Sequence, residues 1–206
     1  MTRDGPACVA ALPRGLSRFR LRHAVRLLHA GGLIVYPTEA VYGIGCDPRN
    51  PQALRRLLAL KHRDPRKGLI LVAASEDQLA PFLHPQTRRA AYMTAVRESW
   101  PGPRTWVLPC ADDISPLLRG AHDTLAVRVT AHPWVAALCR VFGGPLVSTS
   151  ANIASRPPAR GLLDVRRMFG AGLDIRRDAL LSGPVDRRLR PTPIRDARSG
   201  RVLRKG

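Results

Sequence analysis

Three cations lie close together at the end of a predicted helix. Lys61 and Arg63 are separated by one residue, and Lys67 follows four residues later. Side chains two positions apart beyond a helix end can enter one concavity, where lysine supplies a point charge and arginine a planar fork for phosphate oxygens. The alternative is that these cations cap the last carbonyl groups of the helix and interact with its dipole. Taken alone, the cluster favours capping.

A second candidate site is a run of small polar residues directly after the apolar pair 146–147. The run contains Ser148, Thr149, Ser150 and Asn152. Hydroxyl and amide groups at the carboxyl end of a buried strand can bind the oxygen atoms of a ligand. A turn rich in serine and asparagine is the alternative, which the run by itself favours.

Arg128 interrupts an apolar strand predicted over 124–130. A cation in such a strand is expensive to bury unless a carboxylate or an anionic ligand accompanies it. An Asp or Glu from elsewhere in the fold can be that partner, and so can an anionic substrate.

Other kinds of site find little support. The six histidines lack metal-ligand spacing and the chain has no G-x-S-x-G motif, so neither a metal site nor a serine-hydrolase triad is predicted. The glycines at 43 and 45 are too few for a dinucleotide fingerprint, and no P-loop is present. The four cysteines form no C-x-x-C pair, which excludes a zinc site or disulfide framework and favours a reducing compartment.

The composition suits one folded domain with a basic surface. The 206 residues are 45% hydrophobic, and 34 Lys and Arg against 15 Asp and Glu give a net charge of +19. No apolar run is long enough for a membrane span and no signal peptide is evident, so we expect a soluble, cytoplasmic protein. The charge indicates either nucleic-acid binding or solvated arginine from a GC-rich genome, since only three of the cations are lysines.

Hydrophobic periodicity predicts helices alternating with strands, and hence a largely open α/β sheet. Helices are expected from the cap Ser17 to Ala30, from Pro51 to Lys61, briefly after a Ser75–Gln78 capping box, and over 86–98, 133–142 and 162–169. Strands are expected over 33–36, 69–73, 105–108, 124–130 and 146–148, with a loop over 38–47 and a hairpin around 199–200.

Several motifs in order resemble the YrdC/TsaC family of threonylcarbamoyl-AMP synthases, in its short bacterial TsaC branch. They are Pro37-Thr38-Glu39-Ala40-Val41-Tyr42-Gly43, Gly45-Cys46-Asp47-Pro48, Lys61-x-Arg63, Lys67-Gly68-Leu69-Ile70-Leu71, Ser150-x-Asn152, Ile194-Arg195-Asp196 and Leu203-Arg204-Lys205-Gly206. The resemblance implies one YrdC-like domain over 16–206. Its fold is a single-domain open twisted α/β sheet of mixed parallel and antiparallel strands flanked by helices, with a large basic concavity. Residues 1–15 lie outside the resemblance, and we expect them to form a mobile tail.

The resemblance also implies a nucleotidyltransferase reaction. L-threonine, bicarbonate or CO2, and ATP give L-threonylcarbamoyladenylate and pyrophosphate, for threonylcarbamoyladenosine at position 37 of tRNAs reading codons that begin with A. Mg²⁺ held mainly through the ATP phosphates, the downstream transfer proteins TsaB, TsaD and TsaE, and tRNA binding are implied as well. The nucleophile is the carbamate of threonine, which agrees with the absence of a recognisable side-chain nucleophile.

The family's site residues correspond to residues of both clusters. For ATP they are Lys61, Arg63, Lys67, Thr124, Ser150, Asn152 and Arg204, of which Lys61, Arg63, Ser150 and Asn152 are the implied catalytic set. For threonine they are Thr38, Arg128, Ser148 and Thr192, with Arg128 facing the carboxylate, and no side chain is expected to bind metal.

This chain departs from the family at a few positions. Ala40 and Val72 replace residues that contact threonine in longer members, and Pro193 replaces a small hydroxyl residue beside Thr192. Glu39 is a candidate base by position only, and hydrogen bonding to amides of its own loop is the alternative.

Two rival functions use the same features. A non-enzymatic RNA-binding or ribosome-maturation protein would use the basic cleft for phosphates. A carbamoyl-transferring enzyme that shares this domain would carry extra zinc-finger and acylphosphatase modules, for which the chain has neither the cysteines nor the length.

Overall fold

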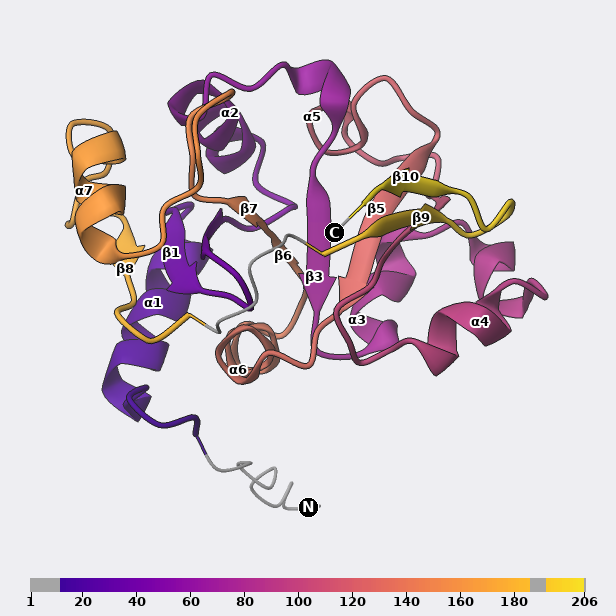
Figure 1. The fold of residues 1–206 in the computed structure, drawn as a ribbon, viewed down its shortest axis with the longest axis horizontal. Coiled ribbons are helices and arrows are strands. Elements are labelled where there is room, and N and C mark those ends of the chain that lie inside the picture. The colour runs from indigo at the N-terminus through magenta and orange to yellow at the C-terminus, as the bar shows by residue number, and fades with distance from the viewer. Residues whose placement is uncertain (1–11, 186–191, 206) are drawn as a thin grey trace, which may run out of the picture.

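The computed structural model describes residues 12–185 and 192–205 (Figure 1). Its α-helices are α1 (Arg18–His29), α2 (Pro51–Leu60), α3 (Glu76–Leu79), α4 (Met93–Glu98), α5 (Pro116–Arg119), α6 (Pro133–Phe142) and α7 (Leu162–Phe169). Short 3-10 helices are η1 (Pro65–Lys67), η2 (Ala80–Phe82) and η3 (Pro85–Arg89). The strands are β1 (Ile34–Pro37), β2 (Tyr42–Gly45), β3 (Ile70–Ala73), β4 (Thr105–Pro109), β5 (Thr124–Val129), β6 (Leu146–Val147), β7 (Thr149–Ser150), β8 (Ala179–Leu180), β9 (Ile194–Asp196) and β10 (Val202–Arg204).

The strands form two sheets of mixed direction. The smaller has the order β7-β2-β1-β8 and the larger β10-β9-β4-β5-β3-β6. β1 with β8, β3 with β5 and β4 with β9 are parallel pairs, and the remaining pairs are antiparallel. The predicted α/β class with mixed strand directions is confirmed. The single predicted sheet is divided because the chain passes at Ser148 from β6 in the larger sheet to β7 in the smaller.

Most predicted helices and strands are confirmed, together with their start signals. The Ser17 hydroxyl accepts the Arg20 N–H at 3.2 Å at the start of α1. The Asn50 side chain accepts the Ala53 N–H at 3.0 Å before Pro51 opens α2. The terminal hairpin is formed by β9 and β10. These helices begin where a side-chain oxygen satisfies an N–H that lacks a helical partner.

The loop predicted over 38–47 is wrong in its second half, which forms β2. Gly43 and Gly45 both lie in this strand, between β1 and β7. A Cβ at Gly45 would lie 1.9 Å from the Val147 carbonyl oxygen, so glycine here permits close approach of two backbones.

Other corrections concern short elements. The helix predicted over 86–98 is two pieces, η3 and α4, with residues 90–92 between them outside any helix. The Ser75–Gln78 capping box is not formed, because Ser75 makes no cap bond and the Gln78 side chain accepts the Ala74 N–H instead. The brief elements β8 and α5 were not predicted.

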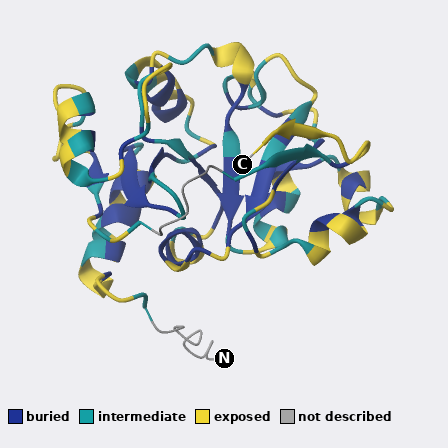
Figure 2. Ribbon diagram, in the orientation of Figure 1, coloured by how far each residue is buried: buried dark blue, intermediate teal, exposed yellow. Residues whose placement is uncertain are grey.

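The core lies on both faces of the strands. Leu33 and Val35 pack into one buried cluster with α2, while Ile34 and Tyr36 pack into a second with α1 and α6. Because successive strand residues point to opposite faces, β1 is an apolar run buried on both sides (Figure 2). α6 contacts β1 of the smaller sheet and β3 of the larger, so it ties the two sheets together.

The described residues leave out part of both chain ends. Of the predicted tail, 1–15, residues 1–11 lie outside the described part, as does Gly206 of the last motif. Leu12 packs partly buried against the cluster of α1 and α6. None of the helices in the described ranges is long and apolar enough to cross a membrane.

Candidate active site

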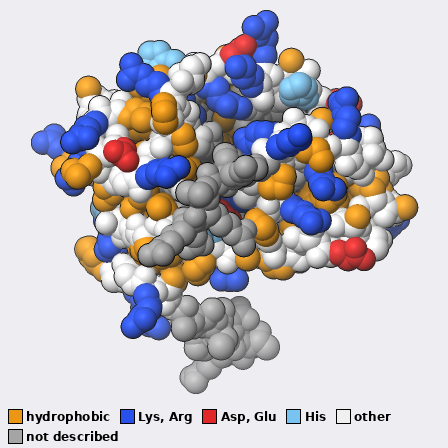
Figure 3. Space-filling view, viewed as in Figure 1, with side chains coloured by type: hydrophobic (Ala, Val, Ile, Leu, Met, Phe, Trp, Pro, Cys, Tyr) orange, Lys and Arg blue, Asp and Glu red, His pale blue; other side chains and the backbone are white. Residues whose placement is uncertain are grey.

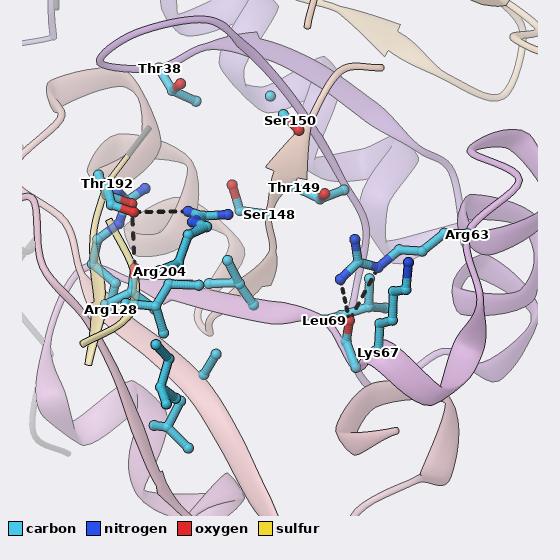
Figure 4. A pocket seen from close by; sticks show the side chains of 18 of the residues that line it. Thr38, Arg63, Lys67, Leu69, Arg128, Ser148, Thr149, Ser150, Thr192 and Arg204 are labelled. Atoms are coloured by element: carbon cyan, nitrogen blue, oxygen red, sulfur yellow. Dashed lines mark hydrogen bonds between the residues drawn. The ribbon is translucent and has the colours of Figure 1, made fainter. Parts of the chain in front are cut away.

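A cavity of about 680 Å³ opens between the two sheets. Its walls come from the 38–43 segment, from η1 and the start of β3, from β5, from the β6–β7 crossing and from the β9–β10 hairpin. Nine of the predicted site residues line it: Thr38, Arg63, Lys67, Thr124, Arg128, Ser148, Ser150, Thr192 and Arg204 (Figure 4). Segments far apart in sequence thus bring both candidate clusters to one space.

The described lining is strongly basic. Its cations are Arg63, Lys67, Arg119, Arg128, Arg201 and Arg204, and its only described acids are Glu39 and Asp196. Lys and Arg likewise outnumber Asp and Glu on the face shown in Figure 3. A concave surface with one sign of charge concentrates ligands of the opposite sign, so the cavity suits an anion with several charges.

Arg63 and Lys67 form one wall of the cavity. The Arg63 guanidinium donates from Nε at 3.2 Å and from Nη2 at 2.9 Å to the Gly68 carbonyl oxygen. Burial lowers the pKa of Arg63, and the Lys67 side chain beside it is exposed. Figure 4 shows both side chains on one side of the cavity, opposite Arg128 and Arg204.

Lys61 does not line the cavity, although only one residue separates it from Arg63. The Arg63 N–H donates to the Leu58 carbonyl and the His62 N–H to the Ala59 carbonyl, which closes α2 with His62 at a positive φ of 49°. This reversal sends Arg63 into the cavity and leaves Lys61 only 3% exposed. The expectation that both cations enter one concavity is therefore not met in this structure.

Lys61 instead contacts the second cluster. Its Nζ donates to the Asn152 carbonyl oxygen at 2.7 Å, to Asn152 Oδ1 at 3.2 Å and to the Ser150 carbonyl oxygen. Asn152 also lies outside the cavity lining, and its Oδ1 accepts the Ser150 hydroxyl at 2.6 Å. Ser150 is thus the member of this group that faces the cavity. Burial and the charge of Arg63 lower the pKa of Lys61 to about 7.

Arg128 has a partial counter-charge. Its Nη2 lies 3.6 Å from Glu39 Oε2, and Glu39 Oε1 accepts the Thr130 hydroxyl at 3.4 Å. Its Nε is buried and has no hydrogen-bond partner among the described residues. Glu39 is therefore placed against Arg128 and Thr130, and the structure shows no bond from its carboxylate to described amides of its own loop. The guanidinium retains capacity for a second anion.

The opposite wall supplies hydroxyl groups and one more cation. Arg204 donates to the Thr192 carbonyl at 2.8 Å, and the Thr192 hydroxyl lies 3.5 Å from that of Thr105. Partial burial lowers the pKa of Arg204, and the charges of Arg128 and Arg63 add to this effect. The Thr38 hydroxyl donates to the Val41 carbonyl at 2.6 Å and so shapes the 38–41 turn.

Several lining residues were not predicted from the sequence. Arg119 closes α5 and donates to the carbonyls of Ile114 and His122, which places its guanidinium and His122 at the rim. Arg201 and Asp196 belong to the terminal hairpin. No spacing pattern marks these positions, because loops and hairpins with no periodicity bring them to the cavity. Among the described residues, no cluster of three or more His, Cys, Asp or Glu could hold a metal ion.

Comparisons with known proteins agree with this geometry. A sequence profile of the Sua5/YciO/YrdC family, described as "Telomere recombination", matches residues 26–206. The threonylcarbamoyl-AMP synthase of Halorhodospira halophila is 55% identical over 193 residues, covering 94% of this chain and 98% of the relative. That of Nitrosococcus oceani is 51% identical over 186 residues, covering 90% of this chain and 97% of the relative.

Solved structures show the same fold. P. abyssi Sua5 complexed with L-threonine superposes with a TM-score of 0.78 at 26% identity, over 90% of this chain and 53% of the Sua5 chain. This chain therefore spans about half the length of Sua5. E. coli YciO matches with a TM-score of 0.72 at 22% identity, over 89% of this chain and 86% of YciO, a likeness of fold alone. The profile match and the identity to full-length relatives establish that the chain belongs to the Sua5/YciO/YrdC family.

Proposed function

We propose that this protein is a threonylcarbamoyl-AMP synthase. It joins L-threonine, bicarbonate or CO2, and ATP into L-threonylcarbamoyladenylate and releases pyrophosphate, together with water when bicarbonate is the carbon source. The observation that supports this best is the basic cavity, in which phosphate-binding cations on one wall face a buried, incompletely neutralised arginine on the other. Relatives that cover nearly the whole chain have this name, and the Sua5 structure holds threonine.

Arg63 and Lys67 bind the triphosphate of ATP from one wall. Attack at the α-phosphorus forms a bond to the carbamate oxygen and breaks the bond to the β-phosphate bridging oxygen. Charge on the departing pyrophosphate is stabilised by fixed cations that need no rearrangement during the reaction. Thr124 and Ser150 add hydroxyl groups to the cavity lining. The β9–β10 hairpin brings Arg204 to the opposite wall, where it adds a positive charge on the other side of the adenylate.

Arg128 binds the threonine carboxylate. Its unpartnered Nε and its long contact to Glu39 leave room for a second carboxylate, and burial strengthens such a pair. Thr38, Ser148 and Thr192 line the same cavity and supply hydrogen-bonding groups for the zwitterion. Holding the carbamate and the α-phosphorus together removes most of the entropic barrier of a bimolecular step. Glu39 acts as counter-charge in this arrangement.

Mg²⁺ enters as part of the nucleotide substrate. The lining offers only two carboxylates in the described residues, one beside Arg128 and the other bonded to Ser199, so its donor set suits an ion held by phosphates. Its charge adds to that of the arginines on the triphosphate.

The product links this reaction to tRNA. A mixed anhydride such as the adenylate is reactive and needs transfer to its acceptor, here adenosine 37 of tRNAs reading codons that begin with A. TsaB, TsaD and TsaE are the proposed transfer partners, in the cytoplasm. The net charge of +19 supports contact with tRNA during this handover.

Pyrophosphate release from ATP by the purified protein tests the proposal. Release should require both L-threonine and bicarbonate, and mass spectrometry should detect the adenylate. Arg63→Ala, which removes a cavity cation, should reduce the rate by about 10²-fold or more. Folded wild-type protein that releases no pyrophosphate with both substrates and Mg²⁺ present would contradict it. RNA binding would then be the function to pursue.

A further inference from the structure

Lys61 contacts the chain from Ser150 to Ala154 through both its side-chain amine and its backbone carbonyl. Its Nζ donates to the Ser150 and Asn152 carbonyl oxygens and to Asn152 Oδ1. Its own carbonyl accepts the Ala154 N–H at 2.8 Å. The three acceptors use all three hydrogens of the ammonium form, and they outnumber the two hydrogens of the neutral amine. No hydrogen remains for a ligand oxygen.

The segment that Lys61 holds continues from β7, which pairs with β2, and Ala151 anchors it through bonds from its N–H to the Tyr42 carbonyl and from the Ala159 N–H to its own carbonyl. Between Asn152 and Pro158 the chain is in turns and bends. Asn152 bonds inward, since its Nδ2 donates to the carbonyls of Ile153 and Arg156 and its Oδ1 accepts the Ser150 hydroxyl. Without Lys61, three oxygens of this segment would lose a buried cationic donor. Asn152 Oδ1 accepts from both the Lys61 amine and the Ser150 hydroxyl, so removal of Lys61 is expected to change the direction of that hydroxyl.

We propose that Lys61 is a positioning residue that acts through Asn152 and Ser150 and does not touch the nucleotide. This rests on the proposed function and changes the role of one residue in it. Arg63 and Lys67 contact phosphate, and Lys61 holds the Ser150–Asn152 segment from outside the cavity lining. The positive φ at His62 is the structural device that separates the two roles.

A double-mutant cycle distinguishes positioning from direct contact. Two residues that act through one group give effects that do not multiply, whereas independent contacts do. Lys61→Met and Asn152→Ala are measured singly and together. Lys67→Met is the matched control, because it removes the same side chain from the exposed wall of the same cavity.

We expect Lys61→Met and Asn152→Ala each to reduce kcat/KM for ATP by about tenfold or more. The kcat/KM of the double variant should lie within about threefold of that of the less active single variant. Lys67→Met combined with Asn152→Ala should instead give the product of the two single effects. Multiplying effects for Lys61 and Asn152 overturn the proposal, as does a wild-type kcat/KM for Lys61→Met.

Two further readouts keep the test decisive. ATP affinity by calorimetry runs the same cycle without turnover, so failure of the synthase reaction in wild-type protein is separable from failure of the coupling. If Lys61→Met does not fold by circular dichroism, Lys61→Gln takes its place, since glutamine retains an amide donor for the same oxygens.

Discussion

Single residues in the cavity show how the fold separates structural cations from those that face a ligand. Lys61 and Arg63 differ by two positions, yet one is buried with every hydrogen engaged and the other lines the cavity. Arg128 lies between these extremes, with one long contact to Glu39 and a free Nε. Positive charge with incomplete neutralisation is costly to bury, and that cost is recovered when an anionic substrate binds.

Lys61 should take up a proton when ATP binds above pH 7. Burial and the charge of Arg63 hold its pKa at about 7 in the free protein, so the amine is mostly neutral at pH 8. A triphosphate beside Arg63 offsets that repulsion and raises the pKa, and a group whose pKa rises on binding gains protons between its two pKa values.

Calorimetry of ATP binding in buffers with different ionisation enthalpies measures this uptake. At pH 8 the wild-type protein should take up a larger fraction of a proton than Lys61→Met, and at pH 6 the two should agree. Because ATP itself titrates near neutrality, only the difference between the two proteins is used. Equal proton uptake at pH 8 would show that Lys61 does not titrate in this range.

At the scale of elements, the sequence indicates which residues form the site better than it indicates the strand that supports them. Ser17, Asn50 and Pro51 predict helix starts correctly because capping is local chemistry. The sequence does not predict β2, since Gly45 permits a close approach to Val147 that only the fold creates. Arg119 is not predicted either, because only the fold brings it to the cavity lining.

A buried carboxylate ties the segment after α7 to the smaller sheet. Asp178 has a fully buried side chain that accepts the N–H groups of Leu33 at 2.8 Å and Asp174 at 2.9 Å, and pairs with both ends of the Arg56 guanidinium. It thereby joins β8 and β1 to α2. Asp178→Ala leaves a guanidinium and two amides without partners, which destabilises the fold by about 3 kcal/mol.

Urea unfolding followed by tryptophan fluorescence checks this value. Asp77→Ala is the control, because Asp77 pairs with Arg88 on the surface with its side chain 80% exposed, where an ion pair contributes about 0–1 kcal/mol. Asp178→Ala should retain pyrophosphate release per folded molecule, since Asp178 lies outside the cavity lining. Equal stability losses for the two variants would refute a supporting role for this pair.

The whole molecule has a charge of +19, and its cavity lies between two sheets that are both in contact with α6. The long-range field of such a surface attracts ATP, which has several negative charges, far more than it attracts zwitterionic threonine. Salt reduces the Debye length from about 10 Å at 0.1 M to about 3 Å at 1 M and so removes the attraction beyond the cavity mouth.

The KM for ATP should therefore rise by about fivefold or more between 0.1 and 1 M potassium chloride, while the KM for threonine changes less than about twofold. Pyrophosphate release measures both constants, with free Mg²⁺ held fixed and sucrose as the uncharged control solute. In the proposed function, threonine binds through Arg128, whose side chain is buried, and salt screens a buried contact weakly. Equal salt dependence of the two constants would mean that the surface charge of this protein serves another partner, and that the cavity cations alone select the nucleotide.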